Sequence, residues 1–103
     1  MNKILLALSL ARKSGKLISG YERVKTSVLK GESSMVVLAA DLSEKTAKRV
    51  KYFCEDLAEV YTISLTQHDI SRVSGRLSGV FALADENMAR LCKKAISQEK
   101  GEL

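Results

Sequence analysis

The chain has 103 residues, of which 46% are hydrophobic and 28% are charged. This length and composition fit one folded domain with one core and argue against a disordered chain or two domains. The formal net charge of +5 favours an acidic partner such as nucleic acid, and a merely soluble surface is the alternative.

Residues 1–11 have two interpretations. Their apolar run, which follows Lys3, has the length of a short signal peptide. The same run also gives a helical stripe, and basic residues crowd the place where a mature chain would begin. We favour a helix from about Asn2 to Ser14 that ends at Gly15, and no segment has the length of a membrane span.

The next elements are marked by caps and glycines. A short extended segment is predicted over 16–18. Ser19 and Glu22, three residues apart, then have the spacing of a capping box that opens a helix ending near Gly31. The continuous apolar run Met35–Ala40 is typical of a strand that is buried on both faces.

A third helix is predicted to open at Asp41 and Ser43. Its apolar stripe consists of Ala47, Val50, Phe53, Cys54 and Leu57. The opposite face carries Lys45, Lys48, Arg49 and Tyr52. A second central strand is predicted over Val60–Ser64.

The last third of the chain repeats this alternation. Thr66 and Asp69 form a second capping box, and the helix that they open ends at Gly75. A tight loop over 76–79 leads into a strand over Val80–Ala84. A final helix follows, capped by Asp85, with a buried line of Met88, Leu91, Cys92, Ala95 and Ile96.

Helices and strands therefore alternate from end to end, which predicts an α/β fold, a three-layer α/β/α sandwich around a small four-stranded sheet. We expect one domain over residues 1–103, with a frayed tail over 99–103. Cys54 and Cys92 fall on apolar helix stripes in no metal-binding spacing, so we expect reduced, buried thiols.

No constellation of catalytic residues is present in the sequence. His68 is the only histidine and has no partner at a zinc-binding spacing. Asp41 and Asp85 follow strands, where α/β active sites often gather, but a helix cap explains both. We expect a protein that is not an enzyme, that needs no cofactor or metal, and that has no small-molecule substrate.

Two glycine-bounded segments favour nucleic-acid binding instead. The first, Lys13–Glu22, leads from a strand directly to a helix N-terminus, where free N–H groups suit a phosphate. The second, Gly75–Gly79, is a compact loop with a cation, an apolar side chain and a hydroxyl. Residues 1–30 hold seven basic residues against one acid, Glu22, for a local charge of +6, so the rest of the chain sums to −1.

Three segments in order resemble the ribosomal L-seven-Ae/L-thirty-e superfamily, and most closely its bacterial YlxQ-type members. They are ARKSGKLISG at Ala11–Gly20, the AxDxS-x2-T pattern at Ala39–Thr46, and Gly75–Asp85 followed by a helix. The resemblance covers roughly residues 2–97. It implies an α/β/α sandwich with a mixed sheet, and binding to kink-turn RNA, in which two stems meet at a sharp bend.

The resemblance also assigns roles to the start of the second helix, which in the family enters the RNA groove. The family's glycine is kept as Gly20, but Glu22, Arg23 and Thr26 stand where it has Asn or Lys, Glu or Gln, and Lys. The family's base-capping loop corresponds to 76–79, where Leu77 offers the apolar contact. The departures from the family pattern favour a rival function, a protein-interaction module that kept the fold and lost specific RNA recognition.

We therefore expect a non-catalytic, cytoplasmic RNA-binding protein whose partner is structured RNA, either kink-turn-like or ribosomal, and which has no membrane association. Its basic residues would neutralise phosphates, its second helix would enter the groove, and its loop would close over the bend. The expected RNA-binding residues are Arg12, Lys13, Lys16, Gly20, Tyr21, Glu22, Arg23, Thr26, Lys45, Lys48, Arg76, Leu77, Ser78 and Gly79.

Each of these roles has a plainer alternative. Glu22 could only complete the capping box, and Gly20 and Gly79 could serve backbone geometry alone. Tyr21 could cover the helix start instead of stacking on a base, and the lysines of the third helix could form an ordinary solvated face. A third hypothesis is a small enzyme or ligand-binding domain near Asp41 and Asp85, and both it and the interaction module rank well below RNA binding.

Overall fold

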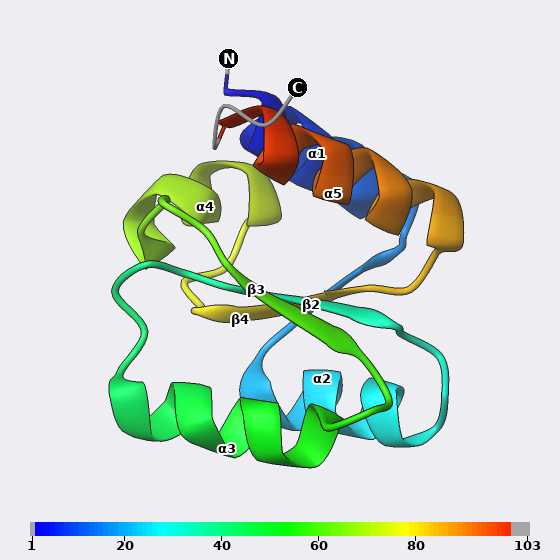
Figure 1. Ribbon diagram of the computed structural model, residues 1–103. Helices are drawn as coiled ribbons and strands as arrows, with labels where there is room; N and C mark the ends of the chain where they lie inside the picture. The colour runs from blue at the N-terminus through cyan, green and yellow to red at the C-terminus, as the bar shows by residue number, and fades with distance from the viewer. Residues whose placement is uncertain (1, 100–103) are drawn as a thin grey trace.

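The computed structural model describes residues 2–99, and helices and strands alternate along them in the predicted order (Figure 1). The helices are α1 (Lys3–Lys13), α2 (Tyr21–Leu29), α3 (Glu44–Cys54), α4 (Gln67–Ser74) and α5 (Glu86–Glu99). The strands are β1 (Leu17–Ser19), β2 (Met35–Leu38), β3 (Glu59–Thr62) and β4 (Val80–Leu83).

The four strands form one mixed sheet in the order β1-β4-β2-β3. β4 is antiparallel to both β1 and β2, and β3 is parallel to β2. The prediction that Val60–Ser64 is a central strand is wrong, because β3 lies at the edge of the sheet. An edge strand tolerates polar side chains such as the exposed Glu59 and Thr62, whereas every residue of β2 and β4 is buried.

Helices cover both faces of the sheet, which confirms the three-layer sandwich. Figure 1 shows α1, α4 and α5 on one side of the strands and α2 and α3 on the other. Alternate residues of the central strands supply the two cores: Val37 and Phe81 pack under α1, α4 and α5, while Val36 and Ala82 pack over α2 and α3. The period of two along each strand thus divides one apolar run between two layers.

Among the starts of α3, α4 and α5, three predicted caps are present and one is not. The Thr66–Asp69 capping box is present, Ser43 caps α3, and the Asp85 carboxylate accepts the backbone N–H of Asn87 at 2.7 Å. Asp41, however, does not cap the helix that follows it. Its Oδ1 atom accepts the backbone N–H of Gln67 at 2.9 Å, so it stabilises the start of α4 instead.

The predicted apolar stripes of α3 and α5 are mostly buried: Ala47 and Met88 are half-buried, and one residue of each stripe is exposed. Leu57 lies beyond the end of α3 and is 54% exposed, and Leu91 of α5 is 40% exposed. The cysteine prediction is confirmed, because Cys54 and Cys92 are free and buried. They belong to different cores on opposite faces of the sheet, so they cannot form a disulfide with each other.

The C-terminal helix closes against the N-terminus. Glu99 is the last residue of α5, and its carboxylate accepts hydrogen bonds from the side chains of Asn2 and Ser64. The remainder of the tail that was expected to fray, 100–103, lies outside the described residues. Over the described range, none of the helices has the length and apolar character needed to traverse a lipid bilayer.

Candidate nucleic-acid interface

The start of α2 differs from the sequence-based prediction. Ser19 is the last residue of β1, where it pairs with Phe81 and is buried, so it does not form the predicted capping box with Glu22. The N-cap is Gly20, with φ 102° and ψ 145°, and no side chain accepts a hydrogen bond there. The first N–H groups of α2 therefore remain open to a ligand, and capping does not explain Glu22.

The two glycine-bounded segments lie side by side. β1 and β4 run antiparallel, so the residue after β1 meets the residue that begins β4. The backbone N–H of Gly20 donates to the carbonyl oxygen of Val80 at 2.9 Å. The loop over 76–79, which leads into β4, is therefore joined directly to the start of α2.

The loop is held in shape by two serines, one at the end of α4 and one in the loop itself. The hydroxyl of Ser74 donates to the carbonyl oxygen of Arg76 at 2.9 Å. The hydroxyl of Ser78 both accepts the N–H of Val80 and donates to its carbonyl oxygen, each at 3.2 Å. Leu77 is left 73% exposed. Ser78 thus has a structural role that the sequence did not indicate, and Leu77 is an apolar side chain presented to solvent.

Arg12 also has a structural role that sequence reasoning missed. Its Nη1 atom donates to the carbonyl oxygen of Val73 at 3.1 Å, joining the end of α1 to the end of α4. The guanidinium lies against Gly75, where an added Cβ would come within 2.6 Å of Nη2. Gly75 also has φ 75°, so its backbone conformation favours glycine, whereas the flexible end of the Arg12 side chain can move away from an added Cβ.

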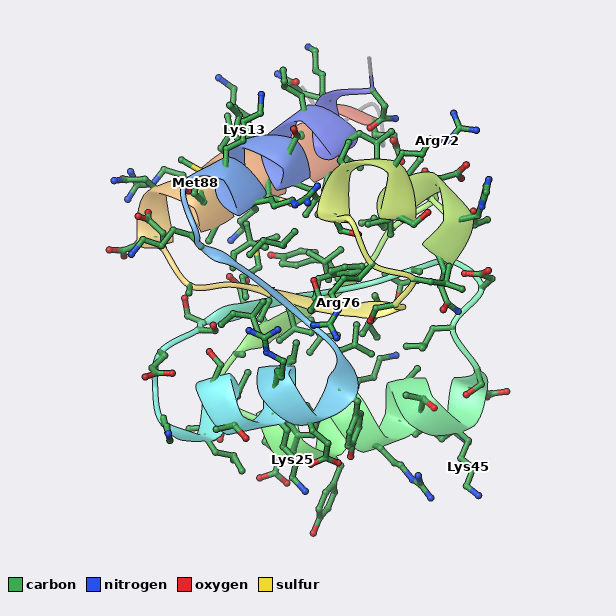
Figure 2. All side chains as sticks on the ribbon, turned by 180° about the vertical axis from the view of Figure 1, so that it is seen from behind. Lys13, Lys25, Lys45, Arg72, Arg76 and Met88 are labelled. Carbon is green, nitrogen blue, oxygen red and sulfur yellow. The ribbon has the colours of Figure 1, made fainter. Side chains whose placement is uncertain are left out.

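Exposed cations surround the joined segments. Lys13, Lys16, Arg23 and Arg76 all have exposed side chains. Figure 2 shows Lys13, Arg76 and Lys25 spread over one face of the molecule, from the end of α1 across the loop to α2. Between residues 2 and 99 the ion pairs formed are Lys48–Glu44 and Lys93–Glu59, so none of these cations is held in an ion pair.

The two sides of α2 differ in charge. Val24 and Val28 face the core, as predicted. One side forms a shallow groove of about 340 Å³ lined by Ile18, Glu22, Arg23, Thr26, Ser27 and Glu32. The other side forms a groove of about 440 Å³ with α3, lined by Tyr21, Lys25, Lys48, Arg49, Tyr52 and Phe53. The predicted residues Glu22, Arg23 and Thr26 therefore share one groove.

Tyr21, Lys45 and Lys48 are divided between the core and the surface. The ring of Tyr21 packs edge-on against Phe53, with ring centroids 5.6 Å apart and an interplanar angle of 78°. It therefore covers, at the helix start, the core that lies between the sheet and helices α2 and α3. Lys48 lines the groove between α2 and α3, whereas Lys45 points away from the body of the protein at the start of α3 (Figure 2).

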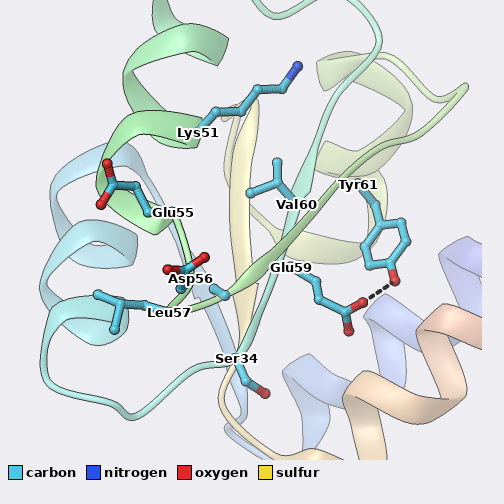
Figure 3. A pocket seen from close by; sticks show the side chains of 9 residues that line it. Ser34, Lys51, Glu55, Asp56, Leu57, Glu59, Val60 and Tyr61 are labelled. Carbon is cyan, nitrogen blue, oxygen red and sulfur yellow. Dashed lines mark hydrogen bonds between the residues drawn. The ribbon is translucent and has the colours of Figure 1, made fainter.

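A hollow at the other edge of the sheet has the wrong charge for a polyanion. It measures about 730 Å³ and lies at the end of α3 and the edge strand β3, where Glu55, Asp56 and Glu59 outnumber Lys51 (Figure 3). Carboxylates that line a hollow repel the phosphates of a nucleic acid that enters it. The cationic face at the start of α2 is therefore the better candidate for a nucleic acid.

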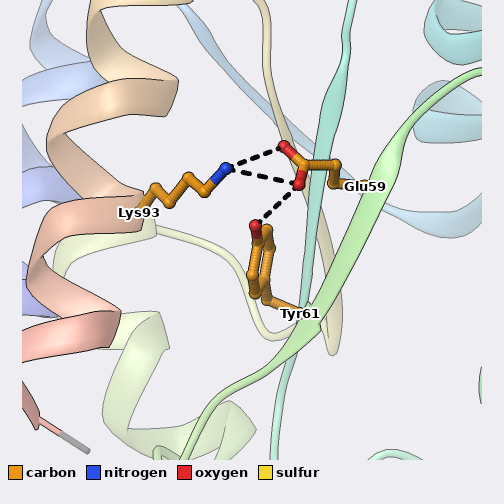
Figure 4. A network of polar contacts seen from close by, with 3 residues as sticks. All are labelled: Glu59, Tyr61 and Lys93. Carbon is orange, nitrogen blue, oxygen red and sulfur yellow. Dashed lines mark hydrogen bonds and ion pairs between the residues drawn. The ribbon is translucent and has the colours of Figure 1, made fainter. Parts of the chain in front are cut away.

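A polar network lies beside that hollow (Figure 4). The hydroxyl of Tyr61 donates to Glu59 Oε2 at 2.9 Å, and Lys93 Nζ lies 3.4 Å from the same atom. These hydrogen bonds, the one from Tyr61 first, lower the pKa of Glu59 below its ordinary value. Glu59 therefore links the edge strand to α5 through Lys93, in an exposed pair that contributes little to stability.

Comparison with known proteins assigns the whole arrangement to one group. The model of the ribosomal protein L7Ae/L30e/S12e/Gadd45 family matches residues 2–95. The chain is 29% identical over 98 residues to the RNA-binding protein YlxQ of Enterococcus faecium, with 91% of each chain covered. It is 30% identical over 99 residues to the large ribosomal subunit protein eL30 of Methanocaldococcus jannaschii, with 93% of this chain and 90% of that protein covered.

Solved structures share the fold. A protein of unknown function from Bacillus halodurans superposes with a TM-score of 0.87 at 24% identity, over 94% of this chain and 99% of that one. The Giardia lamblia 15.5kD RNA binding protein superposes with a TM-score of 0.76 at 13% identity, over 98% of this chain and 88% of that one. At these identities the likeness supports the architecture and nothing further.

Proposed function

Because this chain belongs to the ribosomal protein L7Ae/L30e/S12e/Gadd45 family, we propose that it is a non-catalytic, ribosomal-protein-like RNA-binding protein that recognises kink-turn or similarly bent RNA. Two relatives of nearly full coverage, named as an RNA-binding protein and a ribosomal subunit protein, support the RNA partner. We further propose that it acts in the cytoplasm, where a ribosomal-protein-like chain meets its RNA.

One observation carries the proposal. The start of α2, which no side chain caps, is bonded through Gly20 to the strand that follows the 76–79 loop. A helix N-terminus attracts phosphate through its free N–H groups and its dipole. The exposed Leu77 beside it provides an apolar contact for a base that leaves the stack, as bases do at a bend. A bent RNA offers both features together, whereas a straight duplex offers phosphates alone.

The charged residues have distinct roles in this proposal. Lys13, Lys16 and Arg76 neutralise phosphates on the two sides of the bend. Arg23 and Glu22 lie in the groove of α2, where a guanidinium and a carboxylate together match the acceptors and amino groups of base edges. Thr26 adds a hydroxyl one helical turn later.

A second candidate function rests on the same groove. Glu22 and Glu32 both line it, and two carboxylates weaken its attraction for RNA. They favour the protein-interaction module that kept the fold and lost specific recognition of RNA. In that case the cations would bind nucleic acid only weakly and without regard to its shape.

A binding titration separates the two candidates. The protein is titrated into a labelled kink-turn RNA and into a straight duplex of the same length, at one fixed salt concentration. We expect tighter binding to the kink-turn by about tenfold or more, since base contacts add to the phosphate contacts that both RNAs offer. Equal affinity for the two RNAs would overturn the proposal and leave the interaction module.

A further inference from the structure

The recognition of a bend proposed above does not use the groove between α2 and α3, although two of the expected RNA-binding residues, Tyr21 and Lys48, line it. It has a volume of about 440 Å³, and the side chains that line it are Tyr21, Lys25, Lys48, Arg49, Tyr52 and Phe53. These are three cations and three aromatic rings, and no carboxylate is among them. Interleaved cations and aromatic side chains are the combination with which proteins hold single-stranded nucleic acid.

Tyr52 is the side chain that most needs an explanation. It is 77% exposed on α3, so its ring contributes little to the core. A single exposed aromatic residue is ordinary on a protein surface. This one, however, lies in a groove with Lys25 and Arg49, where a base stacked on the ring would place its phosphates beside cations.

Two aromatic rings of the groove, those of Phe53 and Tyr21, are held by packing against the core. Phe53 is only 9% exposed, and Tyr21 packs edge-on against it. Both rings are supported by the core between the sheet and helices α2 and α3, which includes the buried Val50 and Cys54. A ligand therefore meets a preformed surface and pays little to order it, which favours binding.

The single ion pair in the groove does not block it. Lys48 Nζ lies 3.8 Å from Glu44, and the two side chains are 76% and 86% exposed. An exposed pair of this kind is weak, and an RNA phosphate competes readily for the lysine. The groove therefore keeps a positive character. It lies next to the start of α2, because Tyr21 directly follows Gly20.

We propose that this groove binds an unpaired RNA segment that continues from the bent RNA at the start of α2, with Tyr52 stacking on a base and Lys25, Lys48 and Arg49 holding its phosphates. The inference rests on the proposed function and deepens it, since it defines the RNA as a bend with a single-stranded extension. A protein segment could fill the groove only if its acidic groups met the three cations and its apolar groups met the rings. The family relationship favours RNA as the occupant.

The test compares two RNAs and three proteins. One RNA is a kink-turn with blunt stems, and the other carries an unpaired pyrimidine extension of about six nucleotides. The wild type is expected to bind the extended RNA about tenfold more tightly, as stacking of one or two bases provides. Tyr52→Ala should remove that gain and leave blunt RNA unchanged, whereas Tyr52→Phe keeps the ring and should keep the gain. Because Tyr52 is exposed, both variants should unfold at the wild-type urea midpoint.

The outcomes distinguish the two proposals. The groove proposal is overturned if the wild type binds both RNAs with equal affinity, or if Tyr52→Ala lowers the affinity for both RNAs equally. Either result leaves bend recognition intact. In another outcome, the wild type binds the extended RNA but not the blunt kink-turn, and Tyr52→Ala abolishes that binding. This result supports the groove and overturns bend recognition. In a third measurement, 5-iodouridine in the extension should crosslink to the peptide that contains Tyr52, and crosslinks confined to α1 or α5 would overturn the assignment.

Discussion

The backbone N–H of Gly20 and the carbonyl oxygen of Val80 are 2.9 Å apart, and this hydrogen bond joins the start of α2 to the strand that follows the 76–79 loop. It extends the β1–β4 ladder by one residue after Ser19, at the point where the chain turns into the helix. The turn needs φ 102° at Gly20, a conformation that residues with a Cβ rarely adopt. The candidate interface therefore depends on one backbone conformation.

Gly20→Ala is expected to lower the free energy of unfolding by about 1–3 kcal/mol, measured by urea denaturation. A Cβ at this position would find nothing within 4 Å, so the loss comes from the backbone conformation and not from a clash. Thr26→Ala, at an exposed position of the same helix, should change stability by less than about 0.5 kcal/mol. An equal loss in both variants would show that the helix, and not its start, is sensitive.

Arg23→Glu should weaken binding to a kink-turn RNA by more than about 1 kcal/mol, because it replaces a cation in the α2 groove by an anion. The measurement is a titration at fixed salt. Lys94→Glu makes the same charge change on α5, in the helical layer across the sheet, and it is expected to have a smaller effect. If the two variants lose equal affinity, net charge and not the position of Arg23 governs binding.

Leu77→Ala and Arg76→Ala should differ in how salt affects them, although the two residues are neighbours in the loop. Removal of Arg76 takes away one phosphate contact and should reduce the slope of log K against log salt by about one. Leu77 carries no charge, so its removal should weaken kink-turn binding by about 1 kcal/mol with an unchanged slope. Since Leu77 is 73% exposed, stability should not change. A loss on straight duplex as large as the loss on the kink-turn would contradict a base contact.

Tyr61→Phe should raise the pKa of Glu59 toward its ordinary value of 4.5, because the hydrogen bond from Tyr61 is the largest cause of the lowered pKa. A lowered pKa stabilises the fold above pH 4.5, and that stabilisation is lost as the pH falls through the pKa of the folded state. The pKa is measured by NMR titration of the Glu59 side chain. Lys93→Gln, which removes both the hydrogen bond and the charge of the lysine, should also raise the pKa, and an unchanged pKa in Tyr61→Phe would contradict the role of the Tyr61 hydrogen bond.

Local patterns were sufficient to predict most of the fold. Thr66 and Asp69 specify a helix start by hydrogen bonds within four residues, so their capping box could be predicted from spacing alone. The run of β2 is apolar at every position, which identified it as a strand buried on both faces, and β4, which was predicted as a strand, is buried at every position as well. Strand order depends on pairing between distant segments, and for that reason β3 was wrongly placed in the centre of the sheet.

The candidate site was predictable in outline but not in detail. The glycines marked the helix start and the loop, yet Ser19 and Glu22 matched a capping box only because the sequence does not show that Ser19 is paired in a strand. Arg12 had the position of a phosphate ligand, and its contact with the carbonyl oxygen of Val73 depends on how α1 packs against α4. The groove that contains Tyr52 arises between two helices, so no local pattern could indicate it.

The two buried thiols should make the protein less stable at alkaline pH. Burial raises the pKa of Cys54 to about 11 and that of Cys92 to about 12, from an ordinary value of 9.0. The folded state therefore holds these protons more tightly than the unfolded state, and unfolding releases them between about pH 9 and 12. Stability from the thiols is complete below pH 9 and falls as the pH rises through this window.

The measurement is urea denaturation at a series of pH values for the wild type and for the double variant Cys54→Ala, Cys92→Ala. The double variant should be less stable at neutral pH, because each substitution leaves a small cavity. Above pH 9 its free energy of unfolding should decline less steeply than that of the wild type, since the lysines and tyrosines that also titrate there are common to both proteins. Parallel curves for the two proteins would contradict the raised thiol pKa values, and fast modification of the folded wild type by a thiol reagent would contradict their burial.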